Sequence, residues 1–120
     1  MQQTVVPMIH VPDVRATADW YTSIGFKLVR QNEEDGEMNW ALLSFRNSDI
    51  MLNCDGKPSV SHRREVDLYI VVQDIDDLCR HLKSRVELVE DVHDTFYGMR
   101  EFTIRDFNRF WITFGQPLGK

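Results

Sequence analysis

The segment VPDVRATADWYTSIGFKLV, residues 11–29, is matched in the second half of the chain by VQDIDDLCRHLKSRVELVE, residues 72–90. Each segment has an aspartate at its third position, Asp13 or Asp74, that can accept hydrogen bonds from the backbone N–H groups of a first helical turn. Apolar residues then recur every three or four positions, which indicates an amphipathic helix. The chain is therefore an internal repeat with one helix in each copy.

Outside these helices, apolar and polar residues alternate with a period of two, which is typical of strands with one buried face. We expect strands near residues 4–11, 26–33, 38–45, 49–54, 65–72, 87–93, 99–106 and 109–115. The order βαβββ then occurs twice and predicts an α+β fold: a curved eight-stranded mixed sheet with helices on its outer face and a cleft inside. We place the two halves at 1–56 and 65–120 of a single domain, joined by a linker at 57–64.

The composition excludes several classes of protein. The chain has 120 residues and a net charge of −5, and its cations are not clustered, so we expect no binding to nucleic acid. It lacks an apolar run of about 18 residues and a signal-peptide pattern, so we expect no membrane span and a cytoplasmic location. Cys54 and Cys79 lack the spacing of a metal site and are expected to be buried free thiols.

Alternation within the strands also predicts which side chains face the cleft. Phe102, Ile104, Ile112 and Phe114 should lie beneath the helices, because they occupy alternate positions of their strands, that is, positions of one parity, and so point to one face. The residues between them should face the cleft: Val6, Met8, His10, Asp67, Tyr69, Val71, Glu101, Thr103, Arg105, Trp111 and Thr113.

The repeat and the closing segment YGMREFTIRDFNRFWITFGQP, residues 97–117, resemble the glyoxalase, bleomycin-resistance and extradiol-dioxygenase superfamily, also called vicinal oxygen chelate proteins. The likeness covers nearly the whole chain and is closest to bleomycin-resistance-like members. The family's usual turn D-P-x-G-N is replaced here by DFNRF, residues 106–110.

The resemblance implies four cleft-facing positions at which the family's metal enzymes carry His or Glu. These positions fall on Val6, on Asn53 or Met51, on Asp67 and on Thr113. Only Asp67 offers a carboxylate, and a catalytic divalent metal normally needs three protein ligands. We therefore expect no metal, no other cofactor and no catalytic residue.

We predict a metal-free protein that sequesters a planar or amphoteric small molecule in its cleft, as the bleomycin-binding members of the family do. The resemblance also implies a homodimer. The expected ligand-binding residues are His10, Trp40, Asn53, Asp67, Tyr69, Glu101, Arg105, Trp111 and Thr113.

Other interpretations of the same residues stay open. Glu101 and Arg105 are expected to pair with each other as an alternative to contacting a ligand, because a buried carboxylate needs a partner. His10 is expected to be hydrogen-bonded, and His93, near a strand end, to be solvated. The alternative function is a lyase or dioxygenase-like enzyme of the same superfamily with atypical metal ligands such as His10 and Asp67. These residues do not decide whether the protein is an enzyme, although they weigh against it. A third alternative is an interaction module whose cleft is filled by side chains.

Overall fold

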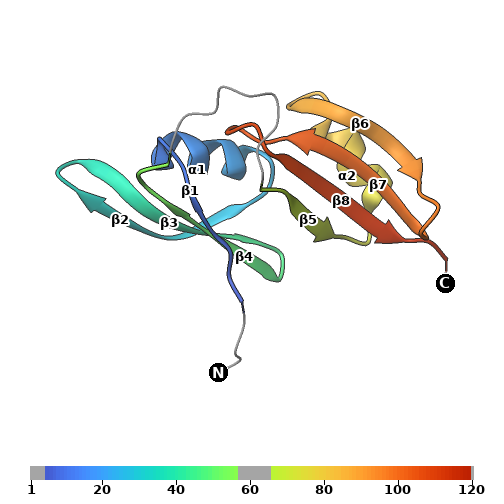
Figure 1. Ribbon diagram of the computed structural model, residues 1–120, viewed down its shortest axis with the longest axis horizontal. Coiled ribbons are helices and arrows are strands. Elements are labelled where there is room, and N and C mark those ends of the chain that lie inside the picture. The colour runs from blue at the N-terminus through green and yellow to red at the C-terminus, as the bar shows by residue number, and fades with distance from the viewer. Residues whose placement is uncertain (1–4, 57–65, 120) are drawn as a thin grey trace. The chain divides into compact units, whose positions relative to one another are not determined.

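The computed structural model describes residues 5–56 and 66–119, which belong to two compact units, Met1–Pro58 and Ser59–Lys120. The first unit contains β1 (Met8–His10), α1 (Val14–Ser23), β2 (Lys27–Glu34), β3 (Glu37–Phe45) and β4 (Ser48–Asn53). The second contains β5 (Leu68–Val71), α2 (Ile75–Leu82), β6 (Glu87–Asp94), β7 (Met99–Arg105) and β8 (Trp111–Pro117). The α+β class and both βαβββ repeats are confirmed (Figure 1). The predicted linker, 57–64, lies outside the described residues.

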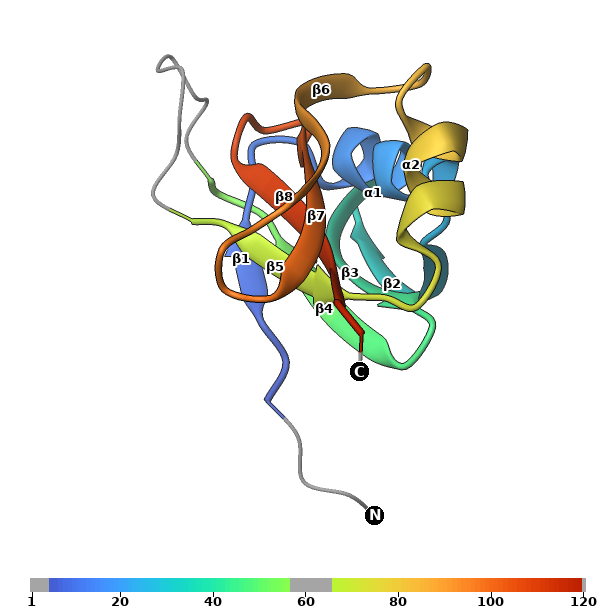
Figure 2. The same cartoon turned by 90° about the vertical axis from the view of Figure 1, so that its right-hand side faces the viewer.

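The eight strands are divided between two four-stranded mixed sheets, with the orders β1-β4-β3-β2 and β5-β8-β7-β6. In each sheet the first strand of the unit runs parallel to the last one, and the other neighbours are antiparallel. Helix α1 packs on β2, β3 and β4, and α2 packs on β6, β7 and β8 (Figure 2). Among the described residues, no helix is long and apolar enough to cross a membrane.

The two helices begin with different caps. The backbone N–H of Ala16 donates to Asp13 Oδ1 at 3.0 Å, so the predicted cap of α1 is confirmed. Asp74 precedes α2 at the equivalent position, but its side chain makes no capping hydrogen bond. The N–H of Ile75 donates instead to Gln116 Oε1 on β8, at 3.0 Å. The predicted Asp74 cap is therefore wrong, because a side chain of the sheet satisfies the helix end and ties it to β8.

The core of the second unit lies between α2 and the sheet. Phe102, Ile104, Ile112 and Phe114 are fully buried, as their parity predicts. The rings of Phe102 and Phe114 stack with centroids 5.0 Å apart. At about 25 cal/mol per Å² of apolar surface, burial of such side chains is the main stabilisation of the unit.

The two cysteines are free thiols with different environments. Cys79 is buried on α2, but Cys54 follows the end of β4 and is only partly buried. The prediction of a buried thiol therefore holds for Cys79 and is wrong for Cys54.

Candidate functional site

The sheet of the second unit has one face packed on α2 and one face turned away from it, here called the distal face. Residues that are partners across neighbouring strands share a face, so the strand register identifies its members. They include Tyr69 of β5, Glu90 and His93 of β6, Glu101, Thr103 and Arg105 of β7, and Trp111, Thr113 and Gly115 of β8. All the candidate residues that the sequence predicts on β5, β7 and β8 therefore share one surface.

A buried carboxylate lies at the centre of the distal face. The Glu101 residue is 6% exposed, and its Oε2 accepts a hydrogen bond from the Tyr69 hydroxyl at 2.7 Å. The hydroxyl of Tyr97, in the turn before β7, lies 2.8 Å from Oε1 and 2.9 Å from Oε2. We call these three residues the Tyr–Glu–Tyr cluster. Hydrogen bonds of this kind compensate for the loss of water around a buried carboxylate.

Glu101 in turn holds both tyrosines in their protonated form. Desolvation, followed by the hydrogen bond to Glu101, raises the pKa of Tyr69. The hydrogen bond to Glu101 is the main cause that raises the pKa of Tyr97, and desolvation adds to it. Loss of either proton would place a phenolate beside the carboxylate. Both hydroxyls are therefore hydrogen-bond donors at neutral pH.

Gly115 makes room for the Tyr69 ring. A Cβ atom at position 115 would lie 2.2 Å from the Tyr69 hydroxyl oxygen and 2.7 Å from Cζ, so any side chain there would collide with the ring. Gly115 is also the partner of Glu101 across β7 and β8. The missing side chain thus lets Tyr69 lie over β8 and reach Glu101.

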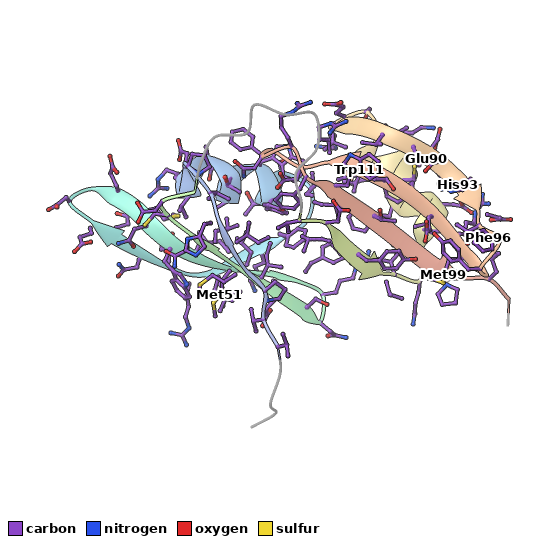
Figure 3. All side chains as sticks on the ribbon, viewed as in Figure 1. Met51, Glu90, His93, Phe96, Met99 and Trp111 are labelled. Carbon is purple, nitrogen blue, oxygen red and sulfur yellow. The ribbon has the colours of Figure 1, made fainter. Side chains whose placement is uncertain are left out.

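Two irregularities in β6 bring a further pair onto the distal face. Register shifts on either side of Glu90 place it opposite Thr103 and place His93 opposite Glu101. Figure 3 labels Glu90 and His93 on β6. Residues three apart in a regular strand point to opposite faces, so the bulges are what align these two. His93 Nε2 lies 3.8 Å from Glu90 Oε2, and Nδ1 lies 3.0 Å from the Asp91 carbonyl oxygen. His93 lies on the edge strand β6 with its side chain 37% exposed, which agrees with a peripheral, solvated histidine, but the sequence does not predict its place opposite Glu101.

The expected pair of Glu101 with Arg105 is wrong. Arg105 Nε donates to Glu87 Oε2 at 3.0 Å, and Glu101 is bonded by the two tyrosines. The two residues share a face of β7 but stand four positions apart, which separates their Cα atoms by about 13 Å.

The other candidates of the second unit have partners within it. The Trp111 backbone N–H donates to Asp67 Oδ1 at 3.3 Å, which joins the residue before β5 to the start of β8. The hydroxyls of Thr103 and Thr113 lie 3.0 Å apart. These contacts stiffen the distal face beside the Tyr–Glu–Tyr cluster.

The candidates of the first unit form a separate row. His10, Asn53 and Trp40 are neighbours across β1, β4 and β3, on the side of the sheet away from α1. His10 Nδ1 lies 2.9 Å from the Cys54 carbonyl oxygen, which can only accept, so Nδ1 carries the proton. The prediction of a hydrogen-bonded His10 is confirmed. The predicted ligand residues thus fall into two sets, one in each unit.

A polar hollow of about 680 Å³ lies elsewhere on the first unit, beside the start of α1 and the β2–β3 turn. Carboxylates dominate its wall, among them Glu34, Asp35 and Asp55. Asp35 and Gly36 form the turn that joins β2 to β3, and both have positive φ angles. The hollow has no aromatic wall, so it is a weaker candidate for a planar ligand than the distal face.

The donors at the family's four metal positions do not fit a catalytic metal. Val6 has no ligating atom, Thr113 offers a neutral hydroxyl, and the choice between Asn53 and Met51 offers an amide or a thioether. Asp67, the one carboxylate, accepts the bond from β8 described above. Within the described residues, no group of three or more His, Cys, Asp or Glu side chains is placed to hold a metal ion.

Comparison with known proteins yields a family match. Residues 3–114 match the Glyoxalase/Bleomycin resistance protein/Dioxygenase superfamily. No curated protein matches the sequence.

Crystal structures with this fold include proteins of different kinds. A glyoxalase-related enzyme from Clostridium phytofermentans has a TM-score of 0.81 at 16% identity, over 98% of this chain and 97% of that chain. A bleomycin-binding protein complexed with bleomycin has a TM-score of 0.71 at 16% identity, over 96% and 98%. TnmS3, an antibiotic binding protein from Streptomyces sp. CB03234, has a TM-score of 0.69 at 23% identity, over 98% of both chains. At these identities the likeness establishes the fold alone.

Proposed function

Because the chain belongs to the Glyoxalase/Bleomycin resistance protein/Dioxygenase superfamily, we propose that it binds and sequesters a planar or amphoteric small molecule, without a metal, on the distal face of its second unit. The fold serves both an enzyme and two binding proteins among the structures above, so the residues must distinguish these functions. The four metal positions favour binding, since they offer one carboxylate among neutral or apolar side chains.

The Tyr–Glu–Tyr cluster is the observation that carries the proposal. Tyr69 and Tyr97 remain 50% and 57% exposed as residues, although their hydroxyls are anchored to Glu101. Phe96 is fully exposed beside them, and its ring meets that of Tyr97 edge to face with centroids 5.1 Å apart. Exposed rings held in place by hydrogen bonds lose little entropy when a planar ligand stacks on them.

The remaining candidates have supporting roles in this proposal. Trp111, Thr113 and Arg105 would border the ligand on the same face, and Asp67 would hold Trp111 in position. The row of His10, Asn53 and Trp40 is proposed as a second contact surface, to be tested separately. A homodimer is proposed from the family resemblance, and sedimentation velocity measures it.

Titration of tryptophan fluorescence with a panel of planar cationic, neutral and anionic compounds tests the function. We expect at least one saturable ligand, bound about three- to tenfold more weakly by Tyr97→Ala, because a stacking ring is removed. Trp20→Phe is the matched control, since it changes an aromatic residue of α1 that belongs to neither proposed contact surface. Absence of binding by the whole panel, with the protein folded by circular dichroism, would count against the proposal.

A further inference from the structure

The two tyrosine hydroxyls of the cluster have no proton left for a ligand. A phenol has one donor and two acceptor directions. The Tyr69 proton is directed at Glu101 Oε2, at 2.7 Å, and the Tyr97 proton at both carboxylate oxygens, at 2.8 and 2.9 Å. What the hydroxyls still offer on the distal face is oxygen lone pairs, which accept hydrogen bonds and cannot donate them.

The charge behind these hydroxyls is negative. No arginine or lysine among residues 5–56 and 66–119 forms an ion pair with Glu101. On β7, Arg100 is bonded to Asp76 at 3.0 Å and to Asp94 at 2.8 Å, and the Arg105 guanidinium is bonded to Glu87. His93 is opposite Glu101 on β6, and its Nδ1 lies 3.0 Å from the Asp91 carbonyl oxygen.

The carboxylate acts on a ligand through the tyrosines. Glu101 is 6% exposed, whereas Tyr69 and Tyr97 are about half exposed, so a ligand on the distal face meets the tyrosines before it meets the carboxylate. Hydrogen bonds to a carboxylate polarise each hydroxyl and make its oxygen a better acceptor. Gly115 maintains this arrangement, because a side chain there would displace the Tyr69 hydroxyl.

From these contacts we infer that the ligand group taken by the Tyr–Glu–Tyr cluster is a cationic hydrogen-bond donor: an amidinium, a guanidinium or a primary ammonium group. The inference rests on the proposed function and narrows it from planar compounds in general to those that carry such a group. A neutral amide presents the lone pairs of its oxygen as well as its N–H donors to the same oxygens. A carboxylate presents lone pairs alone, and the charge of Glu101 repels it.

Three compounds of the same size test the inference: benzamidine in its cationic form, benzamide and benzoate. Isothermal titration at neutral pH measures each dissociation constant. We expect wild-type protein to bind benzamidinium at least about tenfold more tightly than benzamide, since hydrogen bonds to charged groups are the stronger ones. Benzoate should bind most weakly.

Two variants assign the preference to the cluster. Glu101→Gln removes the charge, and the amide can donate to a tyrosine and release a hydroxyl proton, so the preference for benzamidinium should disappear. Tyr97→Phe keeps the exposed ring and removes one acceptor oxygen. It should therefore weaken the binding of benzamidinium about fivefold and leave the binding of benzamide nearly unchanged. Glu37→Gln makes the same chemical change at an exposed site of β3 and should keep the full preference.

The outcomes separate this inference from the proposed function. Equal affinity for benzamidinium and benzamide, or an unchanged preference in both cluster variants, would overturn the cationic class. Binding of neutral or anionic panel compounds that depends on Tyr97 would then still support the proposed function. If no panel compound of any charge bound the folded protein, both would fail together.

Discussion

Replacement of Gly115 by alanine should break the Tyr–Glu–Tyr cluster without unfolding the protein. The new Cβ atom would lie 2.2 Å from the Tyr69 hydroxyl oxygen, far inside the 3.4–4 Å range of ordinary contact. The hydroxyl must therefore move by more than about 1 Å, which breaks its 2.7 Å hydrogen bond to Glu101. Tyr69 is half exposed, so its ring has space to swing away.

The expected change in the free energy of unfolding is the difference between two opposing contributions. A hydrogen bond to a charged group contributes about 1.5–3 kcal/mol, which we reduce to about 1–2 kcal/mol because water reaches Tyr69 and screens the bond. Alanine in a strand is about 0.5–1 kcal/mol more favourable than glycine, since it restricts the unfolded chain. Gly115→Ala should therefore lower the free energy of unfolding by up to about 1.5 kcal/mol.

Urea denaturation of a double-mutant cycle checks this mechanism. In a Tyr69→Ala background the collision and the hydrogen bond are both absent, so Gly115→Ala should become stabilising, by about 0.5–1 kcal/mol. In a Tyr97→Ala background, which keeps Tyr69, it should stay destabilising. An equal loss of stability with and without the Tyr69 ring would refute the account, because it would locate the strain in the strand itself.

Three further predictions concern the carboxylate, the helix caps and metal content. Tyr69 and Tyr97 have raised pKa values in the folded protein, so their contribution to stability is complete below about pH 10 and is lost as pH rises above it. Glu101→Gln should bring both ionisations back toward the ordinary range and reduce that loss, as measured by absorbance at 295 nm and urea denaturation; unchanged titration would mean that the carboxylate is not their partner. Asp13→Ala and Gln116→Ala each remove a helix cap and should each cost about 0.5–2 kcal/mol in thermal unfolding, whereas a negligible cost for Gln116→Ala would contradict the cap supplied by β8. Protein purified without chelators and offered Mn, Fe, Ni and Zn should hold less than stoichiometric metal by elemental analysis; a full equivalent would favour the enzyme alternative.

Local periodicity explains why the fold can be predicted from this sequence. Helical spacing after Asp13 and Asp74, and alternation in the other segments, are properties of neighbouring residues, and they recur in both halves. Parity also assigns Phe102 and Glu101 to opposite faces of β7 correctly. That the halves form a single domain with 57–64 as its linker stays a prediction, as do the ligand-binding roles.

The contacts of the Tyr–Glu–Tyr cluster and its neighbours depend on features that strand parity does not predict. Tyr97 lies in a turn, where no alternation assigns a face, although its position four residues before Glu101 is a signal that it can reach back to β7. His93 reaches the distal face through bulges in β6, which the composition of that strand does not indicate. Arg105 shares a face with Glu101, yet its partner is across the sheet, on β6. Strand parity predicts which face of the sheet a side chain occupies, but it does not predict which side chains on that face are close enough to bond.

The most direct test of ligand binding on the distal face is a map of amide chemical shifts in ¹⁵N-labelled protein, titrated with the tightest compound from the fluorescence panel. The account predicts that the largest shifts belong to Tyr69, Tyr97, Glu101 and Gly115, and that they saturate with the same dissociation constant as the fluorescence. Largest shifts in the row of His10, Asn53 and Trp40, or at the acidic hollow of the first unit, with the Tyr–Glu–Tyr cluster unmoved, would contradict it.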